Sequence, residues 1–228
     1  MVSPDYATVT ATIAASQGSK AEAVRAAAAS LDSLTADLRA HGGVALDADT
    51  ERRPLTWSAQ SVTTYAEQAH DDTTGRYQPT GQVTATVPVM IAVRAFELLD
   101  PLGAVLAARE AVSVQQVGWH VDWDNPAWPA VRAAAIQAAV RKGRDYAAAL
   151  GGALSSVEHI ADAGLLEGNN APREFAFSSA SARTGSPGGE SEAPSLDPVP
   201  QELAAIIEAR FTAAGVSLAA QRPTRSAR

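Results

Sequence analysis

The stretch VTATVPVMIAV, residues 83–93, decides the fold of this chain, because its odd-numbered positions are all aliphatic. Alternation with a period of two is typical of a β-strand with one buried face. Pro88 lies inside the stretch and has no backbone N–H, so we expect a sheet edge or a bulge there. Working outward, residues 83–166 alternate between strand and helix patterns, which indicates a domain built from both.

Helix patterns are predicted at residues 19–40, 100–110 and 127–150. The first begins with Ser19-Lys20-Ala21-Glu22, a capping box, and ends at Gly42-Gly43, where glycine favours helix termination. The second begins at Asp100-Pro101, with Asp100 as the expected N-cap. The third is rich in alanine, and its spacing predicts a buried face made of Ile136, Val140, Ala147 and Leu150.

The remaining strands complete an α+β prediction: an antiparallel sheet with helices packed on one face. Residues 6–13 alternate as a half-buried strand, and residues 55–93 predict a long antiparallel hairpin. The apolar positions change parity between Val114 and Val117, so we predict a β-bulge at Gln115-Gln116. Strands are also expected at residues 154–160 and in the last part of the chain, where the inward-facing residues are Ile207, Ala209, Phe211 and Ala213.

Composition divides the chain into four parts. Residues 1–166 form the main domain, and residues 199–218 add the final strand that completes it. Between them, residues 167–198 are rich in Gly, Ser and Pro and predict a flexible, dispensable insertion, because they bury too little apolar surface to offset their ordering entropy. Residues 219–228 are expected to be a disordered tail.

Charge and composition exclude several functional classes. The 228 residues carry a net charge of -7, and Arg141, Lys142 and Arg144 form only a local basic cluster, so no nucleic-acid partner is expected. The chain has no cysteine, hence no disulfide, thiolate metal site or cysteine nucleophile. No window is long and apolar enough to span a membrane, and no export signal is visible. We therefore expect a cytoplasmic protein, or a periplasmic or cell-envelope protein if an export signal was removed.

A search for metal and cofactor chemistry finds no signature. The four histidines, His41, His70, His120 and His159, are far apart, and no pair has ligand spacing. His70-Asp71-Asp72 is the densest polar cluster, but it lacks the spacing of a calcium loop and is interpreted as a hairpin tip. His41 is interpreted as a residue at a helix C-terminus. No metal or cofactor residue is predicted.

Catalytic motifs are absent as well. Gly185-Ser186-Pro187-Gly188-Gly189 has the wrong spacing for a nucleophile elbow, and Gly18-Ser19-Lys20 lacks the upstream glycine of a phosphate loop. Glu202 and Glu208 are a carboxylate pair that any fold might bring together, so they carry little weight. No catalytic residue is predicted, and the chain is interpreted as a non-enzyme.

With these elements in place, the order and several segments resemble the SIMPL domain family, also called DUF541. The resemblance covers residues 5–166 and 198–218 and rests on structural patterns. The segments that carry it are Gly75-Arg76-Tyr77, Ala92-Val93-Arg94, Arg144-Asp145-Tyr146-Ala147, Leu150-Gly151-Gly152, Val157-Glu158-His159-Ile160 and Pro198-Val199-Pro200.

The resemblance implies an interaction or structural protein, because the family includes bacterial envelope proteins and an animal signalling adaptor and has no recognised catalytic residues. Ring-like oligomers and links to stress responses in some members imply a homo-oligomer, with an unknown protein partner and a role in stress as further expectations. The long hairpin at 55–93 independently favours self-association through its exposed edges. The alternatives are a binder of a small apolar ligand, held between the helices and the Trp119–Trp123 strand face, and, less favoured, a hydrolase. Trp119, Trp123 and Trp128 could line such a groove, but they are interpreted as core residues packed under the helices.

Overall fold

The structure is a computed structural model that describes residues 1–71, 75–163, 174–177 and 197–217. Its elements, in chain order, are β1 (Tyr6–Gln17), α1 (Lys20–Ala40), β2 (Val44–Ala45), β3 (Leu55–Ala59), β4 (Thr63–Asp71), β5 (Arg76–Val93), the 3-10 helix η1 (Phe96–Leu98), α2 (Leu99–Ala107), β6 (Val112–His120), α3 (Trp128–Ala149), β7 (Ala153–Asp162), β8 (Glu174–Phe177), β9 (Glu202–Ala205) and β10 (Ile207–Ala214). The predicted α+β class is confirmed.

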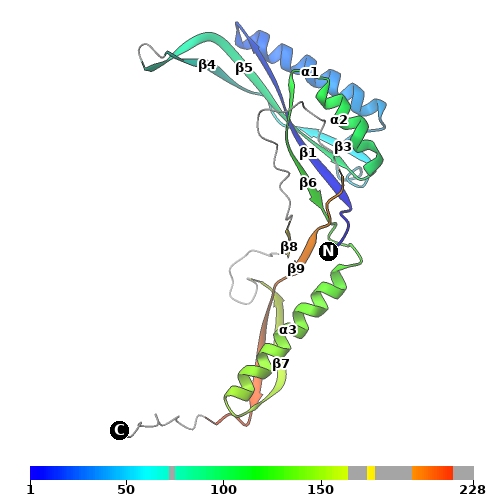
Figure 1. Cartoon of the computed structure of the whole chain (residues 1–228), viewed down its shortest axis with the longest axis vertical. Helices are drawn as coiled ribbons and strands as arrows, with labels where there is room; N and C mark the ends of the chain where they lie inside the picture. Colours follow the sequence, from blue (N-terminus) through cyan, green and yellow to red (C-terminus); the bar gives the residue numbers. More distant parts are fainter. Residues whose placement is uncertain (72–74, 164–173, 178–196, 218–228) are drawn as a thin grey trace. The chain divides into compact units, whose positions relative to one another are not determined.

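The chain forms two compact units. Unit 1 comprises Met1–Asp122 and Ser178–Gln201, and unit 2 comprises Trp123–Phe177 and Glu202–Arg228. Unit 1 contains a six-stranded sheet in the order β2-β3-β5-β1-β6, with β4 also paired to β5. The pairings are antiparallel except for the short parallel pair of β2 with β3. Helices α1 and α2 cover one face of this sheet (Figure 1).

The core of unit 1 follows from the alternation in β1 and β5. Their register pairs Val9 with Ile91 and Ile13 with Val87, so aliphatic side chains of both strands lie on the same face. Those residues pack under Leu34 and Leu38 of α1 and the buried leucines of α2. Burial of aliphatic side chains of this kind contributes about 1.5–3 kcal/mol each. This layer of aliphatic contacts holds α1 and α2 on the sheet.

Helix α1 begins and ends as the sequence predicts. The N-cap Ser19 accepts a hydrogen bond from the backbone N–H of Glu22 at 3.3 Å and donates its hydroxyl to the carboxylate of Glu22 at 2.7 Å. At the other end His41 is the C-cap and Gly42 has φ +79°, a conformation that glycine adopts without strain. The predicted place of His41 at a helix C-terminus is confirmed.

Pro88 interrupts one neighbour of β5 and leaves the other intact. On one side β5 pairs with β1 without a break, whereas on the other side β3 ends opposite Val89 and β4 begins opposite Thr86. The carbonyl of Pro88 accepts a hydrogen bond from the backbone N–H of Gln60, which lies in the gap between β3 and β4. The predicted sheet edge is therefore confined to the gap between β3 and β4. Neither strand pairs with Pro88, so neither requires the N–H that proline lacks.

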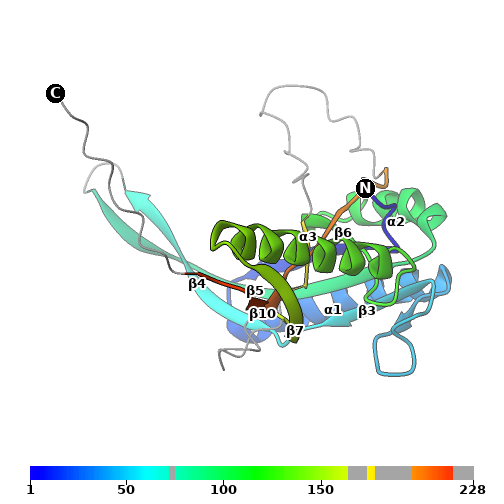
Figure 2. The ribbon, with the colours of Figure 1, turned by 90° about the horizontal axis from the view of Figure 1, so that it is seen from below.

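The β4–β5 hairpin extends beyond the rest of the sheet. Strand β1 ends opposite Val83, so residues 76–82 of β5 are paired with β4 alone. We call residues 66–71 and 75–82 the arm; Figure 2 shows it projecting away from the helices of unit 1. The predicted hairpin is thus confirmed, with β3 as a separate strand at its base.

Unit 2 consists of α3 and short strand pairs. Strand β7 pairs antiparallel with β10, and β8 pairs antiparallel with β9. Gly143 of α3 faces this hairpin, because a Cβ atom there would lie 3.0 Å from the ring of Phe211 and 3.4 Å from Leu154. The expectation that the helix at 127–150 covers the same sheet as α1 and α2 is wrong. Helix α3 packs on the separate two-stranded sheet of β7 and β10.

Several finer predictions are corrected. Helix α2 begins at Leu99 after η1, with Leu98 at the N-cap position, so Asp100 lies in the first turn and does not cap the helix. On α3 only Ala147 of the four predicted face residues is buried, since the hairpin below is too narrow to cover the others. Strand β6 ends at His120, so Trp123 does not lie on the same strand as Trp119. The bulge predicted in this strand is confirmed at Gln115.

The predicted insertion at 167–198 falls largely outside the described residues. Where it is described, Glu174–Phe177 form β8 and are paired with β9, in contrast to the expected absence of structure. The predicted tail at 219–228 lies outside the described residues altogether. Among helices in the described ranges, none has the length and apolar character required to cross a membrane.

Candidate functional site

A polar cluster of unit 1 begins with a row of side chains across three neighbouring strands. Tyr6 of β1 lies opposite His120 of β6, and their rings stack with centroids 4.8 Å apart at 20°. On the other side, Arg94 follows the last residue of β5, and its guanidinium carbon lies 4.7 Å from the centre of the Tyr6 ring. The register that pairs Ala7 with Val93 places Arg94 beside Tyr6. The phenol thus has a cation on one flank and an imidazole on the other.

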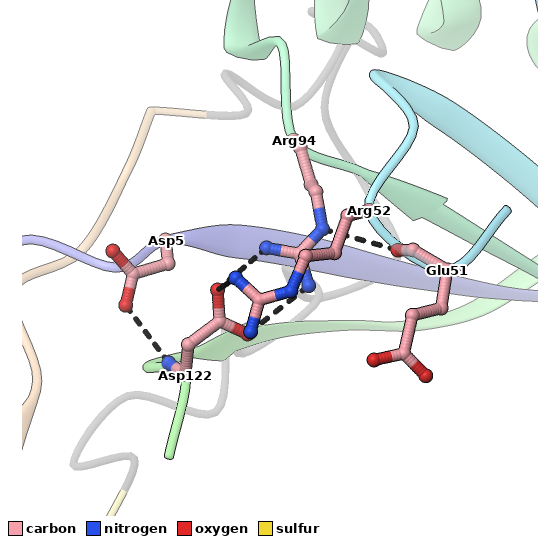
Figure 3. Close-up of polar contacts among 5 residues, drawn as sticks. All are labelled: Asp5, Glu51, Arg52, Arg94 and Asp122. Carbon is pink, nitrogen blue, oxygen red and sulfur yellow. Dashed lines mark hydrogen bonds and ion pairs between the residues drawn. The ribbon is translucent and has the colours of Figure 1, made fainter. Parts of the chain in front are cut away.

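Arg94 also makes the strongest ion pair of the cluster (Figure 3). Its Nη1 and Nη2 donate to Oδ2 and Oδ1 of Asp122 at 2.7 and 3.0 Å, a bidentate arrangement. Its Nε donates to the carbonyl of Glu51 at 3.2 Å. Arg52 Nη1 lies 3.9 Å from Asp122, at a side chain that is half exposed, and contributes less. Arg94 therefore joins the loop before β3, strand β1 and the end of β6.

The backbone of Asp122 is fixed as well. Its N–H donates to Oδ2 of Asp5 at 2.8 Å, while the N–H of Asp5 donates to the carbonyl of His120 at the same distance. Since Asp122 is the last residue of unit 1 before the chain enters unit 2, these bonds fix the point at which the chain leaves unit 1. A second departure point is held by Gln201, which exchanges two backbone hydrogen bonds with Val2 and is fully buried.

The electrostatics of the cluster follow from these contacts. The hydrogen bonds from Arg94 lower the pKa of Asp122, against an opposing contribution from burial. The same bonds to Asp122 raise the pKa of Arg94. Burial, and then the charge of Asp122, raise the pKa of Tyr6. Arginine, carboxylate and phenol are therefore all held in their ordinary charge states at neutral pH.

His120 is the titratable group whose ordinary pKa lies closest to neutral pH. Its Nε2 lies 2.8 Å from the hydroxyl oxygen of Thr8, and burial lowers its pKa. Gly118 makes room for this contact, because a Cβ atom there would lie 3.0 Å from both His120 Nε2 and Thr8 Oγ1. The imidazole is thus favoured in its neutral form.

The cluster has some parts of a catalytic site but lacks others. Thr8 and His120 form the hydroxyl–imidazole pair of nucleophilic catalysis, which also requires a group that orients the imidazole and space for a substrate. The carboxylate of Asp122 is engaged by Arg94. Two open hollows of the described residues lie elsewhere: one of about 540 Å³ is lined by Asp37, Ala104, Val105, Ala108 and Arg109, and one of about 390 Å³ by Ile136, Gln137, Val140, Arg141 and Arg144.

A second polar cluster lies at the base of the arm. Glu67 is the extra residue at a bulge of β4, and its carboxylate accepts hydrogen bonds from the hydroxyls of Ser16 and Thr84. Those two hydroxyls are themselves 2.6 Å apart. The bonds from Ser16 and then Thr84 lower the pKa of Glu67. Because the cluster joins β1, β4 and β5, it fixes the direction in which the arm leaves the sheet.

The structure keeps the histidines considered in the sequence apart. His70 lies on β4 with its ring 5.1 Å from that of Tyr77, and His159 is an exposed residue of β7. Within the described ranges, no group of three or more His, Asp or Glu side chains is arranged to hold a metal ion. The Gly185–Gly189 segment and Asp72 lie outside those ranges, so the His70-Asp71-Asp72 cluster is described only in part.

The tryptophans and the carboxylate pair have separate surroundings. Trp119 is buried with its ring edge-on to Phe96, and Trp128 is buried in unit 2. Trp123 is 73% exposed, so its predicted place in the core is wrong. Glu202 lies on β9 and Glu208 on β10.

Sequence reasoning missed the Arg94–Asp122 pair and the Tyr6–His120 stack. Both depend on strand register, which places residues 28 and 114 positions apart side by side. The available signal was the parity of β1: Tyr6 shares its face with Thr8, opposite the aliphatic face.

With the fold and the cluster described, comparison with known proteins gives one family match. No curated protein matches the chain. The family model described as SIMPL, protein of unknown function (DUF541), matches residues 1–211, which is nearly the whole chain. The chain therefore belongs to the SIMPL (DUF541) family.

Proposed function

We propose that this SIMPL protein is a non-catalytic, self-associating interaction protein. The observation that carries the proposal is the small interior of unit 2: among its described residues only Trp128 and Ala147 are buried. One helix with two separate two-stranded pairs is marginally stable by itself, since a sheet of three or more strands with an apolar face is normally required. Contact with another chain would supply the missing burial.

The exposed apolar side chains of unit 2 support this reading. Val157 and Ile160 of β7 are 47% and 44% exposed, and Leu150 at the end of α3 is 46% exposed. Single exposed aliphatic residues are normal, but several in a unit with almost no interior indicate an incomplete structure.

The arm is a second surface suited to contact between chains. Tyr77 lies near its tip and is 70% exposed, and Tyr65, which directly precedes the arm on β4, is 56% exposed. Tyrosine is enriched where proteins meet, because its ring is apolar and its hydroxyl remains hydrated. The net charge of -7 favours protein over nucleic acid as the partner.

Light scattering at micromolar concentration tests the proposal. The expected mass is at least twice the 23.5 kDa of one chain. A single-chain mass that does not change on concentration would refute self-association. An esterase, phosphatase or peptidase activity lost in His120→Phe, with the fold retained, would refute the non-catalytic part.

Binding of a small amphipathic ligand is a second candidate, favoured by the hollow of about 540 Å³. Its lining includes Ala104, Val105 and Ala108, and the Arg109–Asp37 ion pair supplies charge. Co-purified metabolites identified by mass spectrometry would favour this function if Val105→Trp, which fills the hollow, abolished their retention.

A further inference from the structure

We infer that unit 2 completes its sheet by antiparallel pairing of β7 with β7 of a second copy of the chain. The product is a four-stranded sheet, β10-β7-β7-β10, with both α3 helices on one face. The inference rests on the proposed self-association and names its interface. It starts from an observation on this unit alone: in the described residues β7 pairs only with β10, so its other edge has no strand beside it.

Helix α3 covers one face of the β7–β10 pair unevenly. This face contains Phe211 and Leu154, because both side chains lie next to Gly143 of α3. Glu158 is the extra residue at a β-bulge of β7, so Val157 lies opposite Phe211 and Ile160 lies opposite Ala209. All four side chains therefore share this face. Phe211 and Ala209 on β10 are half-buried, whereas Val157 and Ile160 on β7 are exposed. The uncovered apolar strip therefore lies along β7, the strand whose outer edge is open.

The sequence of β7 is self-complementary about its middle. Residues 157–160 are Val, Glu, His and Ile. An antiparallel pairing with its twofold axis between Glu158 and His159 places Val157 opposite Ile160 of the second copy, and Glu158 opposite His159, each twice. Apolar pairs directly across two strands are stabilising, and so is a carboxylate opposite an imidazole that can donate a hydrogen bond to it. Isologous contacts of this kind are the commonest form of homodimer.

Other charged groups near the axis are compatible with this register. Glu158 accepts a hydrogen bond from the Thr212 hydroxyl at 2.8 Å, which uses one oxygen and leaves Oε2 available for a second donor. Arg210 lies opposite His159 on β10, away from the open edge. The twofold axis runs the two α3 helices antiparallel, so the basic residues Arg141, Lys142 and Arg144 of the two copies lie on opposite sides of the axis.

Standard dimensions allow the two helices to meet. Strands are about 4.8 Å apart, so the centres of two paired hairpins are about 9.6 Å apart. That spacing matches the 8–10 Å between the axes of packed helices. Gly143 lies over Leu154 and Phe211, and the axis lies farther along β7, between Glu158 and His159. With rises of about 3.3 Å per strand residue and about 1.5 Å per helical residue, the part of α3 over the axis is within one turn of Ile136. Ile136 is 36% exposed and becomes an apolar contact between the helices.

Disulfide trapping tests the register, because the chain has no cysteine of its own. Full-length Val157→Cys and full-length Ile160→Cys are mixed and oxidised at micromolar concentration. Directly opposed residues are close enough for a disulfide. The expected product is a covalent dimer in the mixture, with little in either variant alone. Val114→Cys is the matched control partner for Ile160→Cys, because Val114 is also 47% exposed but lies on β6 of unit 1.

A charge exchange provides a second test that does not depend on oxidation. His159→Glu places carboxylates opposite each other twice and should weaken dimerisation about tenfold by light scattering. The double variant Glu158→His with His159→Glu restores a carboxylate opposite an imidazole and should recover most of the affinity. Circular dichroism separates loss of pairing from loss of folding.

Each outcome has a distinct meaning. A covalent dimer in the Val157→Cys and Ile160→Cys mixture, absent from the Val114→Cys control, supports the interface. Multi-chain parent protein without this product, or equal trapping by one variant alone, overturns the interface or its register and leaves self-association standing. A single-chain mass for the parent protein overturns both.

Discussion

At the residue scale, Arg94 is the residue on which the polar side of unit 1 depends. Its guanidinium bonds Asp122, reaches the carbonyl of Glu51 and lies over the ring of Tyr6. The side chains of Arg94 and Asp122 are only 20% and 14% exposed, so their hydrogen bonds are little weakened by solvent. A bidentate pair of this kind positions the chain and leaves neither group free for chemistry.

Replacement of Asp122 by Asn should destabilise the protein by about 2 kcal/mol at pH 7, the typical worth of hydrogen bonds to a charged group. Because Arg94 lowers the pKa of Asp122 in the folded state, this contribution is present above the unfolded pKa of about 4 and is lost as the pH falls through the folded pKa. Urea unfolding of parent and Asp122→Asn at pH 7 and pH 3 measures it. Asp49→Asn, in an exposed loop, is the control; equal effects of both variants would contradict the assignment.

His120 predicts a second pH dependence with its own window. Burial lowers its pKa, so the unfolded chain binds the proton more readily than the folded protein does. Stability should therefore fall as the pH drops below about 6.5, the ordinary pKa of histidine. His120→Phe retains the ring beside Tyr6 and removes the titration, so its melting temperature should change less between pH 7.5 and 5.5. His41→Gln, at the exposed end of α1, should behave as the parent protein does.

At the scale of elements, the interiors of the two units are packed differently. In unit 1 the helices lie on a continuous aliphatic face. In unit 2 glycines allow helix α3 and the strands to approach each other closely. Gly152, between α3 and β7, is an example: a Cβ atom there would lie 2.6 Å from the carbonyl oxygen of Ala214 on β10. Because Gly152 has no side chain, the end of β10 can lie directly against the turn between α3 and β7.

Gly152→Ala should consequently separate the ends of β7 and β10. The clash is with backbone, which cannot move aside as a side chain can, and overpacking of this kind costs about 1–3 kcal/mol. Hydrogen exchange should show faster exchange in β7 and β10 with β1 and β5 unchanged. Gly18→Ala is the matched control, since no atom lies within 4 Å of the added Cβ position. Unchanged protection of β7 in Gly152→Ala would contradict this account.

Elements were predictable where local chemistry specifies them. The capping box at Ser19 and the alternation in residues 83–93 act within a few residues, so α1 and β5 are where the sequence indicates. The assignment of α3 failed because a period of 3.6 shows that a helix has an apolar face but not which sheet receives it. The Arg94–Asp122 pair was missed for a related reason: it is created by register across three strands, which a single strand does not encode.

At the scale of the whole molecule, the two units differ in completeness. Unit 1 has a six-stranded sheet with its own core, whereas unit 2 has one helix with two separate two-stranded pairs. If β7 forms the proposed twofold contact, the arm of unit 1 remains as an independent surface. Two different self-contacts in one chain allow assemblies larger than a dimer.

Shortening the arm should reduce the assembly to two chains. Replacement of residues 69–78 by Asn-Gly closes the hairpin with a two-residue turn and retains the Glu67 contacts with Ser16 and Thr84. Light scattering should then give a mass of two chains, provided the parent protein is larger, and the melting temperature should stay within a few degrees. Parent-sized assemblies of the shortened protein would show that the arm makes no contact between chains.

Strand β5 has a mechanical consequence. Its 18 residues run unbroken for about 59 Å, from the tip of the arm to the position next to Arg94. The strand thus connects the tip of the arm covalently to Arg94, whose guanidinium holds Asp122 at the point where the chain leaves unit 1. Binding of a partner at the arm is therefore expected to change the exchange rate of the Asp122 amide proton, which is hydrogen-bonded to Asp5.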